Sequence, residues 1–174
     1  MTHPVGDTAQ DAERWWRAYQ LAENDLDGEL RERAEAGDEH ARRQLASWLS
    51  DRARTEEAIE VIRPLADGGD EVAERFLAHW LADGDHVDEL RGRASAGSYP
   101  ALYELAEWLS CHERLAELRA LLAAHQEPLA GWLARGAYPM SVVLLAAELG
   151  DDAARRRLLV WLSRLRDRAE AGEE

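Results

Sequence analysis

The sequence predicts an all-α fold, an α-solenoid of stacked antiparallel helix pairs, about five repeats long with a half-repeat at each end. Three observations predict it. A short stretch that begins with Leu or Ile and ends in Gly recurs along the chain. A second apolar pattern follows it at a constant distance, and a residue able to cap a helix lies between the two.

The recurring short stretch is the predicted first helix of each pair. It has an alanine or glycine shortly before its closing glycine and occupies residues 30–37, 62–69 and 90–97. The second pattern, Ala-x3-Leu-x2-Trp-Leu, begins at Ala41, Ala73 and Ala101. Both patterns recur at offsets of 32 and then 28 residues, so they belong to one repeating unit.

The spacing of the apolar residues and the junction between the patterns favour two helices. Positions i, i+4, i+7 and i+8 lie on one face of an α-helix, so the second pattern forms one apolar stripe. The junction glycine suits the left-handed residue that ends a helix, and the Asp or Ser after it can cap the next helix. These residues are Gly37, Gly69, Gly97 and Gly150, followed by Asp38, Asp70, Ser98 and Asp151.

The remaining copies are looser. Residues 129–133 keep the end of the second pattern, and residues 154–162 keep all of it. Residues 12–19 match a second helix with no first helix before it. Residues 165–172 copy residues 30–37 with one change and follow Trp161 without a loop, which predicts that the last helix runs straight through.

The alanines at close-packing positions, with Ala-x-Ala-Gly-Asp joining two helices at residues 34–38, resemble tetratricopeptide repeats and most closely their Sel-like relatives. The resemblance covers residues 27–168. The copies are shorter than the family's usual unit, and the Gly-rich loop of Sel-like repeats is missing. Such families act as protein-interaction scaffolds whose first helices line a concave surface, so the resemblance implies a protein-binding role.

Length and composition fit one domain, predicted as a flexible N-terminus at 1–7, a single helical-repeat domain at 8–171 and a tail at 172–174. No apolar run approaches the ~20 residues that span a bilayer, and the first residues do not form a secretion signal. Cys111 is the single cysteine, which fits a reducing compartment. We therefore expect a cytoplasmic protein that does not contact a membrane.

The charge of the chain bears on its partners. The net charge is −14, and all 21 basic residues are arginine. We expect no direct binding to nucleic acid, because that binding rests on neutralising phosphates. The absence of lysine beside abundant Ala, Arg and Gly is typical of a high-GC bacterial genome, such as an actinobacterial one.

A row of arginines is the first candidate site. The residue after the first-helix Leu or Ile is arginine in four copies and in the last half-copy: Arg31, Arg63, Arg91, Arg119 and Arg166. In a stacked array such a row lines one groove and presents guanidinium groups to an acidic peptide or a free C-terminus. Alternatively, the arginines pair with the chain's own acids, such as Glu29, Glu60, Asp67 and Glu89.

Tryptophans are the second candidate. Five of the seven share one repeat position and are predicted to lie in the core: Trp48, Trp80, Trp108, Trp132 and Trp161. Trp15 differs, because it lies about 100° around the helix from Trp16 and the two cannot both face one core. We predict Trp15 and its counterpart Phe76 as partner anchors, since aromatic residues concentrate at binding hot spots. Packing of Trp15 against the N-terminal segment is the alternative.

Catalytic and metal-binding patterns are the third candidate, and none is convincing. Cys111, His112 and His125 lack the spacing of a zinc site. There is no P-loop, no G-x-S-x-G and no H-E-x-x-H motif. We expect no active site, no metal and no cofactor.

The sequence therefore predicts a non-catalytic scaffold or regulatory adaptor that binds a protein or peptide, including an acidic one, in the solenoid groove. An acidic mimic of nucleic acid that inhibits a DNA-binding protein is the main alternative, and an enzyme built on a repeat scaffold is a weaker one. Self-association through the ends of the array is a further expectation, because an uncapped repeat presents an unsatisfied face.

Overall fold

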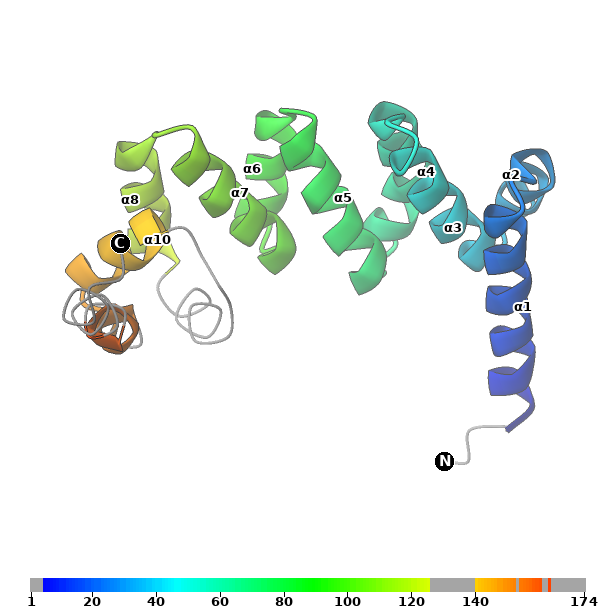
Figure 1. Cartoon of the computed structure of the whole chain (residues 1–174), viewed down its shortest axis with the longest axis horizontal. Helices are drawn as coiled ribbons and strands as arrows, with labels where there is room; N and C mark the ends of the chain where they lie inside the picture. Colours follow the sequence, from blue (N-terminus) through cyan, green and yellow to red (C-terminus); the bar gives the residue numbers. More distant parts are fainter. Residues whose placement is uncertain (1–4, 126–139, 153, 161–162, 164–174) are drawn as a thin grey trace, which may run out of the picture. The chain divides into compact units, whose positions relative to one another are not determined.

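In the computed structural model, residues 5–125, 140–152, 154–160 and 163 are described, and these residues form α-helices joined by short turns, with no strand among them (Figure 1). The chain divides into two compact units, residues 1–89 and 90–174. In each unit consecutive helices pack against one another, as in an α-solenoid. The predicted fold class is confirmed.

The first unit is a run of helix pairs preceded by one single helix. Helix α1 packs against both α2 and α3, α2 packs against α3, α3 against α4, and α4 against α5. The helices are α1 (Val5–Glu23), α2 (Asp27–Glu35), α3 (Glu39–Ser50), α4 (Thr55–Asp67), α5 (Glu71–Asp83) and the start of α6 (Val87–Ser95). In the sequence repeat, α2 and α4 are first helices, and α3 and α5 are second helices.

The second unit contains most of α6 together with α7 (Tyr99–Cys111), α8 (Leu115–Ala124) and α10 (Met140–Glu148). Helix α7 packs against α8, and α10 packs against both. Residues 154–160 are also helical. Trp132 and Trp161 lie outside the residues whose side chains are described, as do residues 165–172.

The turns within each pair follow the sequence prediction. Four junction glycines, Gly37, Gly69, Gly97 and Gly150, have φ between 91° and 100°. The next residue caps the following helix: Asp38 Oδ1 accepts from the N–H groups of His40 and Ala41, both at 3.1 Å. The counterparts Asp70, Ser98 and Asp151 accept backbone N–H groups in the same way.

The turns between pairs use the same backbone geometry without glycine. Each has a left-handed residue two positions before the next first helix, namely Asp25, Ala53, Asp85 and Glu113, with φ between 55° and 58°. The N–H of the residue that follows bonds back five residues, as from Leu26 to the carbonyl of Leu21. These are Schellman-type helix ends, and a non-glycine residue tolerates the left-handed region at a modest cost in energy.

The core is a layer of leucine and alanine between neighbouring helices. Leu30 and Ala34 of α2 are buried, as are Leu90 and Ala94 at the same positions of α6. The second helices bury the predicted stripe, although not always its tryptophan. No polar side chain is buried among the described residues. Each helix pair therefore depends on its neighbours for burial, as a repeat array requires.

Helix α1 begins earlier than the sequence predicts, and α4 is longer than the first helices α2 and α6. Helix α1 begins at Val5, inside the segment 1–7 that the sequence predicts to be flexible. Helix α4 has 13 residues where α2 and α6 have nine. The added turn precedes Ile62 and explains the 32-residue offset between Leu30 and Ile62.

Candidate functional site

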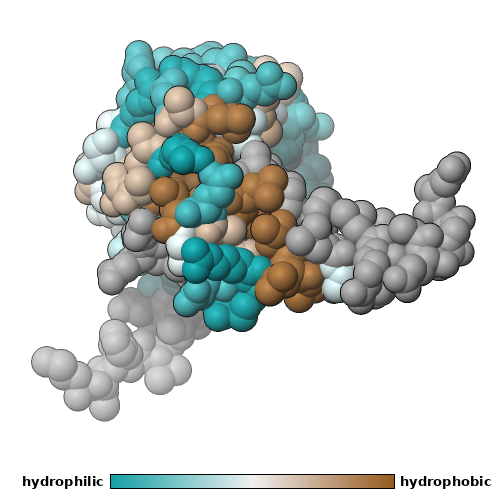
Figure 2. Space-filling model, turned by 90° about the vertical axis from the view of Figure 1, so that its left-hand side faces the viewer, coloured by the Kyte–Doolittle hydropathy of each residue, from teal (hydrophilic) through white to brown (hydrophobic). Residues whose placement is uncertain are grey.

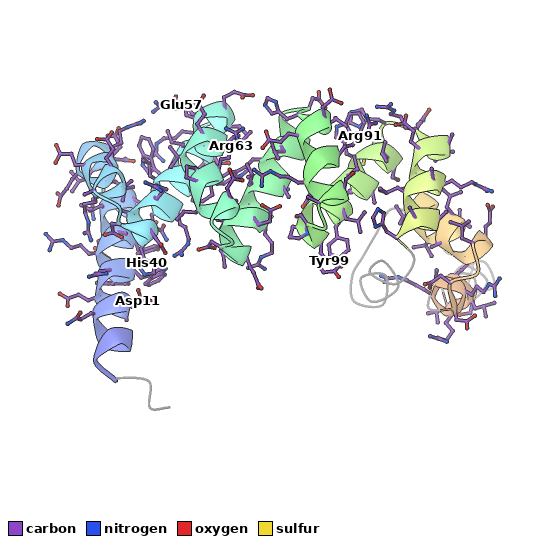
Figure 3. The ribbon with its side chains drawn as sticks, turned by 180° about the vertical axis from the view of Figure 1, so that it is seen from behind. Asp11, His40, Glu57, Arg63, Arg91 and Tyr99 are labelled. Carbon is purple, nitrogen blue, oxygen red and sulfur yellow. The ribbon has the colours of Figure 1, made fainter. Side chains whose placement is uncertain are left out.

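The predicted arginine row forms ion pairs that join each first helix to the next element of the array. Arg31 Nη2 lies 3.6 Å from Glu57 Oε2, and Arg63 donates to both oxygens of Glu89, at 3.2 and 3.0 Å. In the second unit, Arg91 Nη2 donates to Glu117 at 2.5 Å, and Arg119 pairs with Glu148 of α10. Figure 3 labels Arg63, Arg91 and Glu57. We call these pairs the arginine–glutamate ladder.

The acids of the ladder also follow the repeat, a regularity that the sequence analysis missed. Glu29, Glu57, Glu89 and Glu117 are each the third residue of a first helix. A carboxylate in the first turn of a helix is stabilised by the helix dipole. Arg31, Arg63 and Arg91 each precede their partner by 26 residues, and this constant spacing was the available signal.

The ladder therefore satisfies the arginines with the chain's own acids, the alternative raised for them from the sequence. Of the acids that the sequence analysis offered, Glu89 is a ladder partner of Arg63, and Glu29 contacts Arg17 of α1 at 4.0 Å. The pairs are half-exposed. Recognition of an external carboxylate by these arginines remains a prediction, and the ligand would have to replace an internal partner.

Helix α1 presents an aromatic face made of the exposed Trp15 and Trp16 and the half-buried Tyr19, which we call the α1 aromatic face. The ring centroids of Trp15 and Tyr19 are 5.6 Å apart, and those of Trp16 and Tyr19 are 5.8 Å apart. Trp15 is 45% exposed and Trp16 is 54% exposed. The opposite side of the helix, with Ala18 and Leu21, is buried.

The exposure of Trp16 follows its position in the repeat. The left-handed turn residue is Asp25 after α1 and Ala53 after α3, so Leu21 corresponds to Leu49, and Trp16 corresponds to Gln44, Phe76 and Glu104. Phe76 is 39% exposed, and the other two are half-buried. The sequence analysis, which matched residues 12–19 to a second helix, is therefore one residue out of register, and Ala18 and Leu21 form the buried stripe of α1.

The other tryptophans correct one expectation. Trp80 is buried, as predicted, and Phe76 stacks on it with ring centroids 5.4 Å apart. Trp48 and Trp108 are only half-buried. Trp48 donates its indole N–H to Asp25 at 3.2 Å and lies under the guanidinium of Arg52. Its position faces a turn rather than the core, so the indole keeps its polar edge in contact with solvent and charge.

Phe76, the second predicted anchor, remains partly exposed at 39%. Its stacking on Trp80 four residues later explains why an aromatic residue is tolerated there. Trp15, the first predicted anchor, lies on α1 in the same unit as Phe76. Each of the two predicted anchors is thus packed against an aromatic neighbour on its own helix, and only Trp15 belongs to an aromatic cluster of three.

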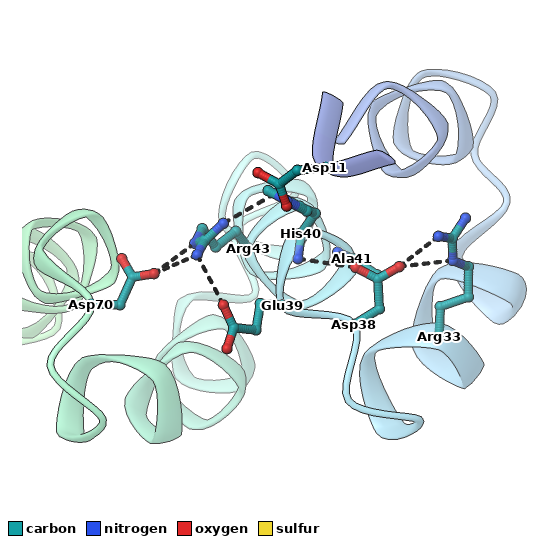
Figure 4. A network of polar contacts seen from close by, with 8 residues as sticks. All are labelled: Asp11, Arg33, Asp38, Glu39, His40, Ala41, Arg43 and Asp70. Carbon is teal, nitrogen blue, oxygen red and sulfur yellow. Dashed lines mark hydrogen bonds and ion pairs between the residues drawn. The ribbon is translucent and has the colours of Figure 1, made fainter. Parts of the chain in front are cut away.

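A polar network fixes α1 against α3 beside an open depression of about 490 Å³ (Figure 4). His40 Nε2 lies 2.7 Å from Asp11 Oδ1, and Arg43 Nη1 lies 3.1 Å from His40 Nδ1. Because arginine only donates, Nδ1 accepts and Nε2 donates to Asp11. That hydrogen bond lowers the pKa of Asp11 below its usual value. Figure 3 shows Asp11 and His40 side by side.

The same network continues into the helix caps. Arg43 also pairs with Asp70, and Arg33 Nη2 donates to Asp38 at 2.5 Å. Burial raises the pKa of Asp38, but hydrogen bonds from Ala41 N–H and Arg33 outweigh it, so the pKa lies below its usual value. The depression is lined by Asp11, Arg14, Ala36, Gly37, Asp38, Glu39 and His40, without a Ser, Thr or Cys. We assign the network a structural role.

Unit 2 also has exposed apolar side chains. Figure 2 shows hydrophobic residues interrupted by hydrophilic ones on the side of this unit that carries α8 and α10. Leu115, Leu144, Leu159 and Val160 are exposed. Leu144 takes the repeat position of the ladder arginines, so the arginine row is interrupted at α10.

The described residues also bear on metal binding and on insertion into a membrane. No group of His, Cys, Asp and Glu there is arranged to hold a metal ion. No helix in that part is long and apolar enough to cross a membrane. Comparison with protein-family models, with curated proteins and with solved structures finds no significant match.

Proposed function

We propose that this chain is a non-catalytic interaction scaffold of the tetratricopeptide-like kind, and that it binds an apolar segment of a protein partner on the α1 aromatic face. The observation that carries the proposal is the cluster formed by Trp15, Trp16 and Tyr19, in which the two tryptophans are 45% and 54% exposed. An exposed apolar surface of this kind is typical of an interaction site.

The type of side chain supports the same site. Trp and Tyr are enriched among residues that dominate binding energy, because they bury a large area and lose little conformational freedom. Trp15 and Trp16 each stack on Tyr19 already, so little ordering is needed when a partner binds. The arginine row is a weaker candidate, since its guanidinium groups already meet carboxylates.

The proposal is tested by affinity capture from a lysate of the source organism, followed by calorimetry with the purified partner. The variants are Trp16→Glu and, as a matched control, Tyr99→Glu, which changes another exposed aromatic residue. We expect a partner that is held by wild type and by Tyr99→Glu and is lost by Trp16→Glu. A partner that binds Trp16→Glu with unchanged affinity would place the binding surface elsewhere.

A further inference from the structure

Two half-buried tryptophans of this chain are covered by an arginine that also meets a carboxylate. The guanidinium of Arg52 lies 4.0 Å from the ring centroid of Trp48 and pairs with Asp25, which accepts the indole N–H at 3.2 Å. In the second unit, the guanidinium of Arg114 lies 5.6 Å from the ring centroid of Trp108 and pairs with a glutamate of α8. An arginine placed in this way gains attraction to an aromatic ring and to a carboxylate at once.

Trp15 and Trp16 are more exposed than these two tryptophans, at 45% and 54%. Among the side chains that the structure describes, no arginine lies over either ring. The arginines of α1 contact other parts of the chain, because Arg14 lines the depression beside the turn between α2 and α3, and Arg17 contacts Glu29 of α2. The rings of both tryptophans are therefore accessible to a cation from another molecule.

Carboxylates flank the α1 aromatic face. Glu13 precedes Trp16 by three residues and Glu23 follows Tyr19 by four, so each glutamate lies next to an aromatic residue on the surface of the helix. Both glutamates are exposed, and no ion pair of either is described within the part of the chain whose side chains are placed. The face thus combines aromatic rings with carboxylates, as the two internal arginine sites do. The net charge of −14 adds a longer-range attraction for a basic partner.

We propose that the segment bound by the α1 aromatic face is basic, and that an arginine of this segment lies over Trp16 and meets Glu13 or Glu23. This rests on the proposed function, because it names the chemistry of the partner at the same face. Arginine is assigned rather than lysine because its planar guanidinium stacks on an indole and donates to a carboxylate, as Arg52 does at Trp48. An acidic segment would place like charges beside the two glutamates.

The test is NMR titration of the whole ¹⁵N-labelled chain with the peptide acetyl-Leu-Arg-Leu-Arg-Leu-Arg-amide, and with the same peptide carrying citrulline in place of each arginine. Citrulline has nearly the shape of arginine but no charge. Each of the seven tryptophans gives one indole N–H signal, and tryptophan-to-phenylalanine variants assign them. The signals of Trp15 and Trp16 are expected to shift, with an affinity for the arginine peptide about threefold or more above that for the citrulline peptide. Equal affinities, or shifts confined to other tryptophans, would overturn the inference.

Variants of the face separate the effect of charge from that of stacking. Glu13→Gln/Glu23→Gln is expected to weaken binding of the arginine peptide about threefold to tenfold, because both carboxylates that meet the guanidinium lose their charge. Trp16→Leu keeps an apolar side chain without an aromatic ring, and is expected to reduce the preference for arginine over citrulline.

A matched control tests whether the glutamates act through their position. Glu60→Gln/Glu107→Gln removes the same charge at exposed positions of α4 and α7, and is expected to bind the arginine peptide as wild type does. If this control and Glu13→Gln/Glu23→Gln weaken binding equally, the affinity comes from the net charge of the chain and the inference is wrong.

Failure of this inference and failure of the proposed function give different results. If the two peptides bind equally but Trp16→Glu still loses a captured partner that Tyr99→Glu retains, the α1 aromatic face binds a partner of other chemistry and only the basic segment is wrong. If Trp16→Glu retains every captured partner and the arginine peptide shifts neither Trp15 nor Trp16, both proposals are wrong.

Discussion

Arg63 of α4 donates two hydrogen bonds to Glu89 of α6, at 3.2 and 3.0 Å, and so joins one first helix to the next. Both side chains are about one-third exposed. Solvent therefore screens the pair, and its contribution belongs with surface ion pairs rather than with buried ones. The ladder is a regular feature of the fold in which each rung is weak.

A double-mutant cycle on this pair tests that description. Arg63→Ala, Glu89→Ala and the double variant are expected to give a coupling energy of about 0.2–1 kcal/mol, because the pair has two hydrogen bonds but remains in contact with water. Urea unfolding followed by circular dichroism measures it. The same cycle on Arg75 and Glu89, between which no ion pair is described, serves as the control. A coupling energy indistinguishable from this control would show that the rung adds nothing.

Two glycines in different backbone conformations are expected to respond oppositely to substitution by alanine. Gly69 has φ of +91°, where a side chain is strained, so Gly69→Ala should lower the free energy of unfolding by about 1 kcal/mol. Gly92 lies within α6 with nothing within 4 Å of an added Cβ, so Gly92→Ala should raise it by about 0.5–1 kcal/mol. Thermal melting of both variants measures the difference. Equal effects would contradict the assigned turn geometry.

Asp70 is expected to make stability depend on pH. Its carboxylate accepts the N–H groups of Val72 and Ala73 and pairs with Arg43. Burial raises the pKa of Asp70, but these contacts outweigh it and the pKa lies below its usual value. Because the folded pKa is depressed, the stabilisation is present above the unfolded pKa of about 3.9 and is lost as pH falls through the folded pKa.

The measurement compares wild type with Asp70→Asn by urea unfolding between pH 7 and pH 3. At pH 7 the variant keeps an amide oxygen for the cap but loses the charge, and should be less stable by about 0.5–1.5 kcal/mol. The difference should shrink as the pH falls below about 4. A difference that stays constant over this range would mean that the charge of Asp70 does not contribute.

The repeated tryptophans should not be equivalent. Trp80 is buried, and Phe76 stacks on its ring. Trp80→Ala should therefore lower the free energy of unfolding by about 3–5 kcal/mol, because it leaves a cavity in the core. Trp48 is half-buried beside Asp25 and Arg52, so Trp48→Ala should cost less than half as much. Chemical unfolding of the two variants under one condition decides it. Similar losses would mean that Trp48 is a core residue after all.

Sequence reasoning succeeds where one residue type has one physical reason to be present. Gly37 and Asp38 are predictable as a helix end and a cap, because glycine tolerates φ near +90° and an aspartate oxygen satisfies free N–H groups. The turns between pairs are harder to predict from sequence, because Ala53 takes the left-handed conformation although alanine does not favour it. There the geometry is set by the helices on either side.

The candidate site is less predictable than the fold, because it depends on what surrounds each side chain. The spacing of Trp16 from Ala12 assigns it to an apolar stripe, but the buried stripe of α1 is formed by Ala18 and Leu21, and Trp16 lies outside it. Similarly, Arg63 is recognisable as a repeated residue, but its partner lies 26 residues away on another helix. The periodicity of residues within one helix gives no information about a partner on another helix.

The half-exposed rungs of the arginine–glutamate ladder have a consequence for cooperativity. The charges lie between neighbouring repeats, where the Leu and Ala layer also continues from one helix pair to the next. Added salt therefore weakens only the electrostatic part of the coupling between repeats. Raising the ionic strength should lower the unfolding midpoint slightly while the transition stays sharp, because the apolar layer still joins each repeat to its neighbours.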